Sequence, residues 1–121
     1  MQVHEIVSIL QAEPLLVCNE SLMNYEFDYA FATDLMSDAL AMIQNNPEKT
    51  LLVTGLANAQ TLRTAEMLDI KFIVLVRGKV LSEEILEIAR ENNLNLFTTK
   101  HTMYSACGIL YSHGLRGICD E

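Results

Sequence analysis

Short apolar runs alternate with amphipathic helical patterns through the second part of the chain, and this alternation limits the fold more than any other feature. Residues 51–54, 72–76 and 94–97 form the three runs. The run at 72–76 is continuous and rich in β-branched residues, which is typical of a strand covered on both faces. Because strands that alternate with helices favour parallel pairing through crossover connections, the sequence predicts an α/β fold with a mainly parallel sheet.

Capping residues mark where the helices between these runs are expected to begin. Asn, Ser and Thr side chains are favoured caps for the first N–H groups of a helix. Either Thr33 or Asp34 is expected to cap an earlier helix, and Gly114 stands where a left-handed C-cap belongs. The caps expected for the three later helices are Asn58, Ser82 and Thr102. The apolar stripe expected for the last of these helices is Met103, Ala106, Cys107, Leu110 and Tyr111.

The N-terminal part is expected to complete the edge of the sheet. Val3, Ile6, Val7 and Leu10 have the spacing of a one-faced helix, and less regular strand patterns follow before residue 33. No shift of composition marks a linker, and half of the 121 residues are apolar, which is enough for one core. We therefore expect one domain over residues 1–121.

The charge balance excludes several classes of partner. The chain has 16 Asp and Glu against 8 Lys and Arg, a formal net charge of −8. This argues against nucleic acid and against an anionic membrane surface. No apolar run approaches the ~20 residues that span a bilayer, and no signal peptide pattern is visible. Three cysteines without close spacing (Cys18, Cys107 and Cys119) favour reduced thiols, so a cytoplasmic location is expected.

Polar and basic side chains gather after the three expected strands, where open α/β sheets bind their ligands. One interpretation is a pocket for a small anionic ligand or a nucleotide. The other is that Thr and Asn serve only as caps while Arg and Lys are solvated. The residues assigned to the pocket are Thr54, Gly55, Asn58, Arg63, Arg77, Gly78, Lys79, Thr99 and Thr102.

Motifs for catalysis, cofactors and metals are weak. The chain lacks the glycine-rich phosphate loop and the dinucleotide fingerprint, so we expect no cofactor. His101, Cys107, His113 and Cys119 recur every six residues, but six residues turn a helical side chain by about 240°, so we expect no metal site. His101 on a loop is the one candidate general base, and no nucleophile is paired with it in the sequence. We therefore assign no catalytic residue.

Residues 51–117, supported by ATDLMSDALA at 32–41, resemble the DRTGG domain. The likeness extends over the whole chain and is strongest to short stand-alone members, which are similar to the N-terminal domain of HPr kinase/phosphorylase. The family has an Asp-Arg pair after one strand, where residues 54–57 here read Thr-Gly-Leu-Ala. It has Thr-Gly-Gly after the next strand, where residues 76–78 read Val-Arg-Gly and Gly78 is retained.

The resemblance implies a homodimeric α/β domain that is a non-catalytic module in larger proteins, beside CBS domains in inorganic pyrophosphatases and within phosphotransacetylases. Aromatic and Met side chains over residues 23–36 agree with a subunit interface, although ordinary core would also explain them. The leading hypothesis is a regulatory or adaptor module, with a protein partner or a small anionic ligand. The alternatives are a small enzyme that uses His101 at the same edge and a purely structural partner-binding protein.

Overall fold

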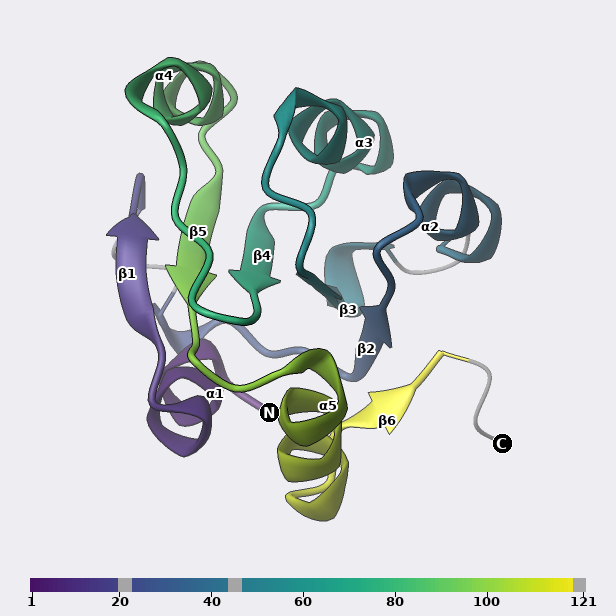
Figure 1. Cartoon of the computed structure of the whole chain (residues 1–121). Helices are drawn as coiled ribbons and strands as arrows, with labels where there is room; N and C mark the ends of the chain where they lie inside the picture. The colour runs from purple at the N-terminus through teal and green to yellow at the C-terminus, as the bar shows by residue number, and fades with distance from the viewer. Residues whose placement is uncertain (20–22, 44–46, 119–121) are drawn as a thin grey trace.

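The computed structural model describes residues 1–19, 23–43 and 47–118, and in these residues a six-stranded sheet has the order β1-β5-β4-β3-β2-β6 (Figure 1). The strands β2 to β6 pair in parallel, and β1 pairs antiparallel with β5 at one edge. This confirms the predicted mainly parallel α/β fold. The strands are β1 (Glu13–Leu16), β2 (Tyr29–Ala32), β3 (Thr50–Thr54), β4 (Phe72–Leu75), β5 (Asn95–Thr98) and β6 (Arg116–Gly117).

Helices cover both faces of the sheet, so the molecule has three layers (Figure 1). On one face lie α1 (Val3–Leu10) and α5 (Met103–Ser112). On the other face lie α2 (Met36–Met42), α3 (Ala59–Leu68) and α4 (Glu83–Glu91). A short 3-10 helix, Pro47–Lys49, leads into β3. None of the helices in the described residues is both long enough and apolar enough to cross a membrane.

The apolar core divides between the two faces because successive side chains of a strand point to opposite sides. In β4, Phe72 and Val74 pack with α1 and α5, whereas Ile73 and Leu75 pack with α3 and α4. All four side chains are buried. The prediction that this run is a strand covered on both faces is confirmed.

The expected caps form at three helices. Asn58 accepts a hydrogen bond from the N–H of Thr61 at 3.1 Å, and Ser82 accepts one from the N–H of Ile85 at 3.3 Å. Thr102 caps α5 in the same way, through the N–H of Ser105 at 3.5 Å. Gly114, at φ 104°, follows the end of α5 in a backbone conformation that favours glycine.

Two expectations for the N-terminal half are wrong. Neither Thr33 nor Asp34 is the N-cap of α2: Leu35 holds that position without a side-chain cap, and the Thr33 hydroxyl accepts a hydrogen bond from its N–H. The strand β2 lies inside the sheet and not at its edge, because β6 pairs beside it. A strand of two residues, as β6 is, has no periodicity from which it could be predicted.

Candidate functional site

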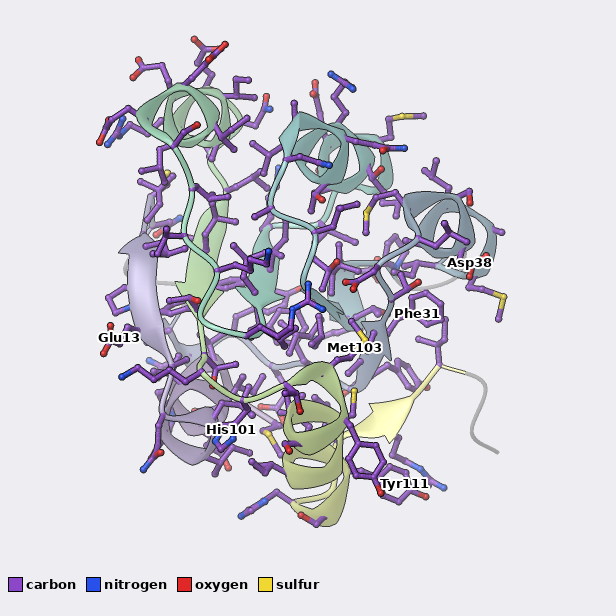
Figure 2. The ribbon with its side chains drawn as sticks, viewed as in Figure 1. Glu13, Phe31, Asp38, His101, Met103 and Tyr111 are labelled. Atoms are coloured by element: carbon purple, nitrogen blue, oxygen red, sulfur yellow. The ribbon has the colours of Figure 1, made fainter. Side chains whose placement is uncertain are left out.

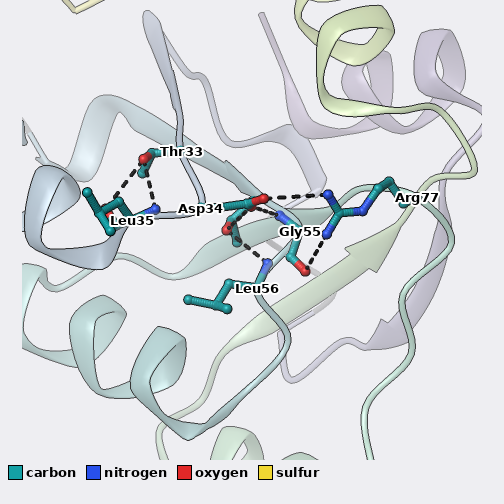
Figure 3. Close-up of polar contacts among 7 residues, drawn as sticks. Thr33, Asp34, Leu35, Gly55, Leu56 and Arg77 are labelled. Carbon is teal, nitrogen blue, oxygen red and sulfur yellow. Dashed lines mark hydrogen bonds and ion pairs between the residues drawn. The ribbon is translucent and has the colours of Figure 1, made fainter.

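The carboxyl ends of β2, β3 and β4 meet in a cluster of polar contacts around Asp34 (Figure 3). Asp34 Oδ1 accepts hydrogen bonds from the N–H of Gly55 at 2.6 Å and from the hydroxyl of Thr54 at 3.2 Å. The other carboxylate oxygen, Oδ2, lies 3.5 Å from Nη1 of Arg77. Arg77 also donates from Nη2 to the Gly55 carbonyl at 3.4 Å. We call these four residues the Asp34 cluster.

The close approach of Arg77 leaves no room for a side chain at position 55 unless the guanidinium moves. A Cβ built on Gly55 would lie 2.5 Å from Nη2 and 2.8 Å from Cζ of Arg77, and 3.2 Å from Oδ1 of Asp34. Any side chain at this position would push the guanidinium away. The guanidinium therefore rests directly over the backbone at the end of β3.

The turn after β4 is attached to the loop after β5. Arg77 and Gly78 have φ values of 64° and 66°, a left-handed conformation that disfavours a residue with a Cβ, such as Arg77. The N–H of Arg77 donates to the carbonyl of His101, and the N–H of Gly78 donates to the carbonyl of Thr99, both at 2.8 Å. These two bonds hold the turn in place and use the backbone donors that it would otherwise offer to an anion.

A cavity of about 540 Å³ lies beside that turn, at the end of β5. We call it the β5-end cavity. Lys100 and His101 from the loop before α5 line it, together with Glu13 from the start of β1. Figure 2 labels His101 and Glu13 on these two segments. Its volume falls in the range of small-ligand sites, roughly 300–1,000 Å³. The full lining is Leu10, Gln11, Glu13, Gly78, Val80, Thr98, Thr99, Lys100 and His101.

The structure distributes the nine predicted pocket residues over three places. Thr54, Gly55 and Arg77 belong to the Asp34 cluster. Gly78 and Thr99 line the β5-end cavity. The others line neither: Asn58 and Thr102 stand at helix starts, Arg63 is exposed on α3, and the exposed Lys79 accepts a hydrogen bond from the Thr98 hydroxyl through its carbonyl.

Several of these side chains already have partners within the fold. The buried Thr99 hydroxyl donates to the carbonyl of Leu10 at 2.7 Å, which joins the end of α1 to β5. The Thr54 hydroxyl is held by Asp34, and Asn58 and Thr102 act as caps. Asn58 and Thr102 therefore act as the caps that the alternative interpretation expects, whereas Thr54 and Thr99 bond within the fold without being caps.

Sequence reasoning missed three residues of this edge. Asp34 was expected only as a possible cap, and Gln11 and Glu13 were not considered for the site. Asp34 follows β2, and because β2 pairs in parallel with β3, both strands end at the same edge. That pairing was the signal that could have identified Asp34.

A second, smaller cavity of about 120 Å³ lies at the amino ends of the strands, near the starts of β3 and β4. Tyr25 and Phe27 form part of its apolar lining, and their rings pack edge to face with centroids 5.1 Å apart. The Tyr25 hydroxyl donates to the Glu48 carbonyl. Burial raises the pKa of Tyr25, and the nearby carboxylates of Glu48 and Asp28 raise it further. Phe27 itself is buried in the apolar core. This agrees with the interpretation of residues 23–36 as ordinary core.

In the part of the chain that the structure describes, no three His, Cys, Asp or Glu side chains converge as a metal site would require. Of the four residues that recur every six positions, His101 lines the β5-end cavity, and His113 contacts the carbonyl of Ile109 through Nδ1 at 2.8 Å. Burial raises the pKa of the Cys107 thiol. Cys119 lies outside the described residues.

The fold and this edge define a small three-layer α/β domain with a ligand-sized cavity at the carboxyl ends of its strands. The model of the DRTGG domain matches residues 5–112, and the chain belongs to the DRTGG domain family. No curated protein sequence matches the chain.

One solved structure with the same fold is that of the CBS and DRTGG domains of the regulatory region of Clostridium perfringens pyrophosphatase, complexed with the activator diadenosine tetraphosphate. The two share 20% sequence identity with a TM-score of 0.66. The match covers 90% of this chain and 45% of that one, so this chain corresponds to less than half of the regulatory region.

Proposed function

We propose that this chain is a cytoplasmic regulatory module that acts as a homodimer and binds a small anionic ligand, with nucleotides as the leading class, in the β5-end cavity. The observation that carries the proposal is the cavity itself, which has a ligand-sized volume and two basic side chains, Lys100 and His101, at its wall. Membership of the DRTGG family supports a regulatory role, since a relative of this fold belongs to a regulatory region whose structure contains a nucleotide activator.

The charges around the cavity suggest how a nucleotide would lie in it. Lys100 and His101 directly precede the N-cap of α5, and the amino end of a helix favours negative charge. Glu13 and Gln11, at the carboxyl end of α1, also line the cavity. Phosphate would therefore bind on the side of Lys100 and His101. An amino group of a base would face Glu13, which can accept a hydrogen bond.

The Asp34 cluster is the weaker candidate for the same ligand. Its guanidinium is already paired with Asp34, and its hydroxyl and backbone donor are directed at the same carboxylate. An anion that approached Arg77 would meet the carboxylate of Asp34 beside it and compete with that ion pair. Gly78 and Thr99 are the predicted pocket residues that we retain for the ligand itself.

Calorimetric titration of the purified protein with AMP, ATP, diadenosine tetraphosphate and inorganic phosphate tests the ligand. We expect at least one nucleotide to bind, and Lys100→Ala and His101→Ala each to weaken that binding about tenfold or more. Lys71→Ala is the matched control, because Lys71 is an exposed lysine at the opposite edge. No binding by any probe, or an equal loss in Lys71→Ala, would refute the ligand proposal.

The homodimer is tested separately by light scattering at micromolar concentration. A dimer has twice the monomer mass of 13.6 kDa.

Affinity capture from the native host with the tagged chain tests the adaptor hypothesis. That hypothesis predicts a stable stoichiometric complex with a second protein.

A further inference from the structure

The helix α5 has an uncharged outer face with two exposed tyrosines, and nothing in the described chain covers it. Its inner face, with Ala106 and Leu110, is buried against the sheet. On its outer side Tyr104 is 90% exposed and Tyr111 is 64% exposed. In Figure 2 the Tyr111 ring projects from α5 beside β6. The sequence pattern places Tyr111 in the inward stripe of this helix, and the structure places it outside.

This outer face differs from that of an ordinary surface helix. The ten residues of α5 include no Asp, Glu, Lys or Arg. By contrast, α4 exposes Glu83, Glu84 and Arg90. A helix that faces water normally carries charged side chains on its outer side, so an uncharged outer face with two large aromatic side chains is unusual.

Gly108 lies in the middle of the same outer face. Glycine inside a helix is destabilising relative to alanine. A Cβ at Gly108 would meet nothing within 4 Å, so no neighbour within the fold requires glycine there. What glycine provides is room for another backbone to approach from outside.

We infer that a second copy of this chain docks on the outer face of α5, with the twofold axis passing beside Gly108. The inference rests on the homodimer of the proposed function and names its interface. Tyr104 and Tyr111 stand four residues before and three residues after Gly108. At 1.5 Å per residue these are nearly equal distances of about 6 and 5 Å, so antiparallel pairing brings Tyr104 of one copy onto Tyr111 of the other.

Charge favours a second copy as the occupant. Each chain carries a net charge of −8, so two copies repel unless they meet where acidic side chains are absent. The face of α5 meets this condition, and the acidic outer face of α4 does not.

The two tyrosines offer roughly 300 Å² per subunit, given that a buried aromatic covers about 150–250 Å². This is more than a third of the about 800 Å² per partner in a stable interface.

The docking face adjoins the ligand cavity. His101 lines the β5-end cavity and also the open groove along the outer side of α5. A second copy seated on that groove therefore lies next to the wall that we assign to the ligand. By thermodynamic reciprocity, a ligand that strengthens the dimer binds the dimer more tightly than the monomer.

Sedimentation equilibrium of wild type and Tyr104→Glu tests the interface. We expect the dimer dissociation constant to rise at least 100-fold, because the substitution buries an unpaired carboxylate against Tyr111 of the other copy. Met67→Glu is the control, since Met67 is 73% exposed on α3, on the other face of the sheet. Circular dichroism verifies that each variant is folded. A Tyr104→Glu protein that dimerises like wild type overturns the α5 interface and leaves the homodimer standing.

Disulfide trapping gives a second readout that does not depend on loss of association. In a background in which the three native cysteines are replaced by alanine, Gly108→Cys is expected to form a covalent dimer rapidly on mild oxidation, and Met67→Cys is not. Equal rates for the two variants would count against the interface. A monomeric wild type would overturn both this inference and the homodimer, whereas the ligand proposal is decided by the titration alone.

Discussion

Asp34 accepts a hydrogen bond from the backbone N–H of Gly55 at 2.6 Å and thereby joins the loop after β2 to the end of β3 (Figure 3). The two residues are far apart in sequence and meet because β2 and β3 are parallel neighbours. The same carboxylate also accepts from Thr54 and pairs with Arg77. Asp34 is therefore the residue on which three strand ends converge.

The first prediction concerns the relative importance of Asp34 and Arg77. We expect Asp34→Ala to lower the free energy of unfolding by about 1–2 kcal/mol, because it removes two hydrogen bonds to a charged group at a half-exposed site. Arg77→Ala should cost less than about 1 kcal/mol, because the side chains of the ion pair are 47% and 46% exposed. Urea denaturation measures both. A larger loss for Arg77→Ala than for Asp34→Ala would contradict this assignment.

The second prediction is that Gly55→Ala acts through Arg77. The new methyl group would lie 2.5 Å from Nη2 of Arg77, so the guanidinium must leave its place over the strand end. We expect a loss of at most about 1 kcal/mol in the wild-type background, because the change displaces the guanidinium and no more than the contribution of Arg77 is lost. A smaller loss is expected in the Arg77→Ala background, because the clash with the guanidinium is absent there. Strictly additive losses in the double-mutant cycle would show that the two residues do not interact.

The sequence predicted those parts of the fold that depend on local patterns. Asn58, Ser82 and Thr102 were identified as caps because a cap depends on a few neighbouring residues. Asp34 was misassigned because its partners at Gly55 and Arg77 depend on the order of strands in the sheet, which no local pattern contains. Tyr111 was misplaced because an apolar residue at helical spacing looks the same on a covered face and on an uncovered one.

The candidate site was only partly predictable for a related reason. The strand ends can be located in the sequence, and Gly78 and Thr99, which follow two of them, line the β5-end cavity. The other side of that cavity comes from Gln11 and Glu13, in the N-terminal part of the chain. Their position follows from β1 pairing antiparallel with β5, and residue types alone do not indicate that pairing.

The third prediction tests the bond between β5 and α1. The Thr99 hydroxyl is buried and donates to the Leu10 carbonyl at 2.7 Å. Thr99→Val keeps the shape but removes the donor, so we expect a loss of about 1–3 kcal/mol from the buried carbonyl that is left without it. Thr99→Ser keeps the donor and is the matched control. If valine and serine cost the same in urea denaturation, the hydrogen bond contributes nothing measurable.

The last prediction concerns the different reactivities of the cysteines. Cys18 is exposed, whereas Cys107 is half-buried and burial raises the pKa of its thiol above the usual 9.0. Because the thiolate is the form that reacts with iodoacetamide, we expect Cys18 to be alkylated several-fold faster than Cys107 at pH 7.5. The rate at Cys107 should still be rising with pH at about pH 9, since much of its thiol remains protonated there.

Peptide mass spectrometry after timed alkylation measures both rates. Trypsin separates the cysteines, because Lys100 and Arg116 bound the peptide that contains Cys107, and Cys119 falls in the C-terminal one. In urea the burial of Cys107 is lost, so its rate should approach that of Cys18. Equal rates for Cys18 and Cys107 in the folded protein would mean that the thiol of Cys107 is open to solvent. That result would contradict the half-buried position of Cys107 on α5.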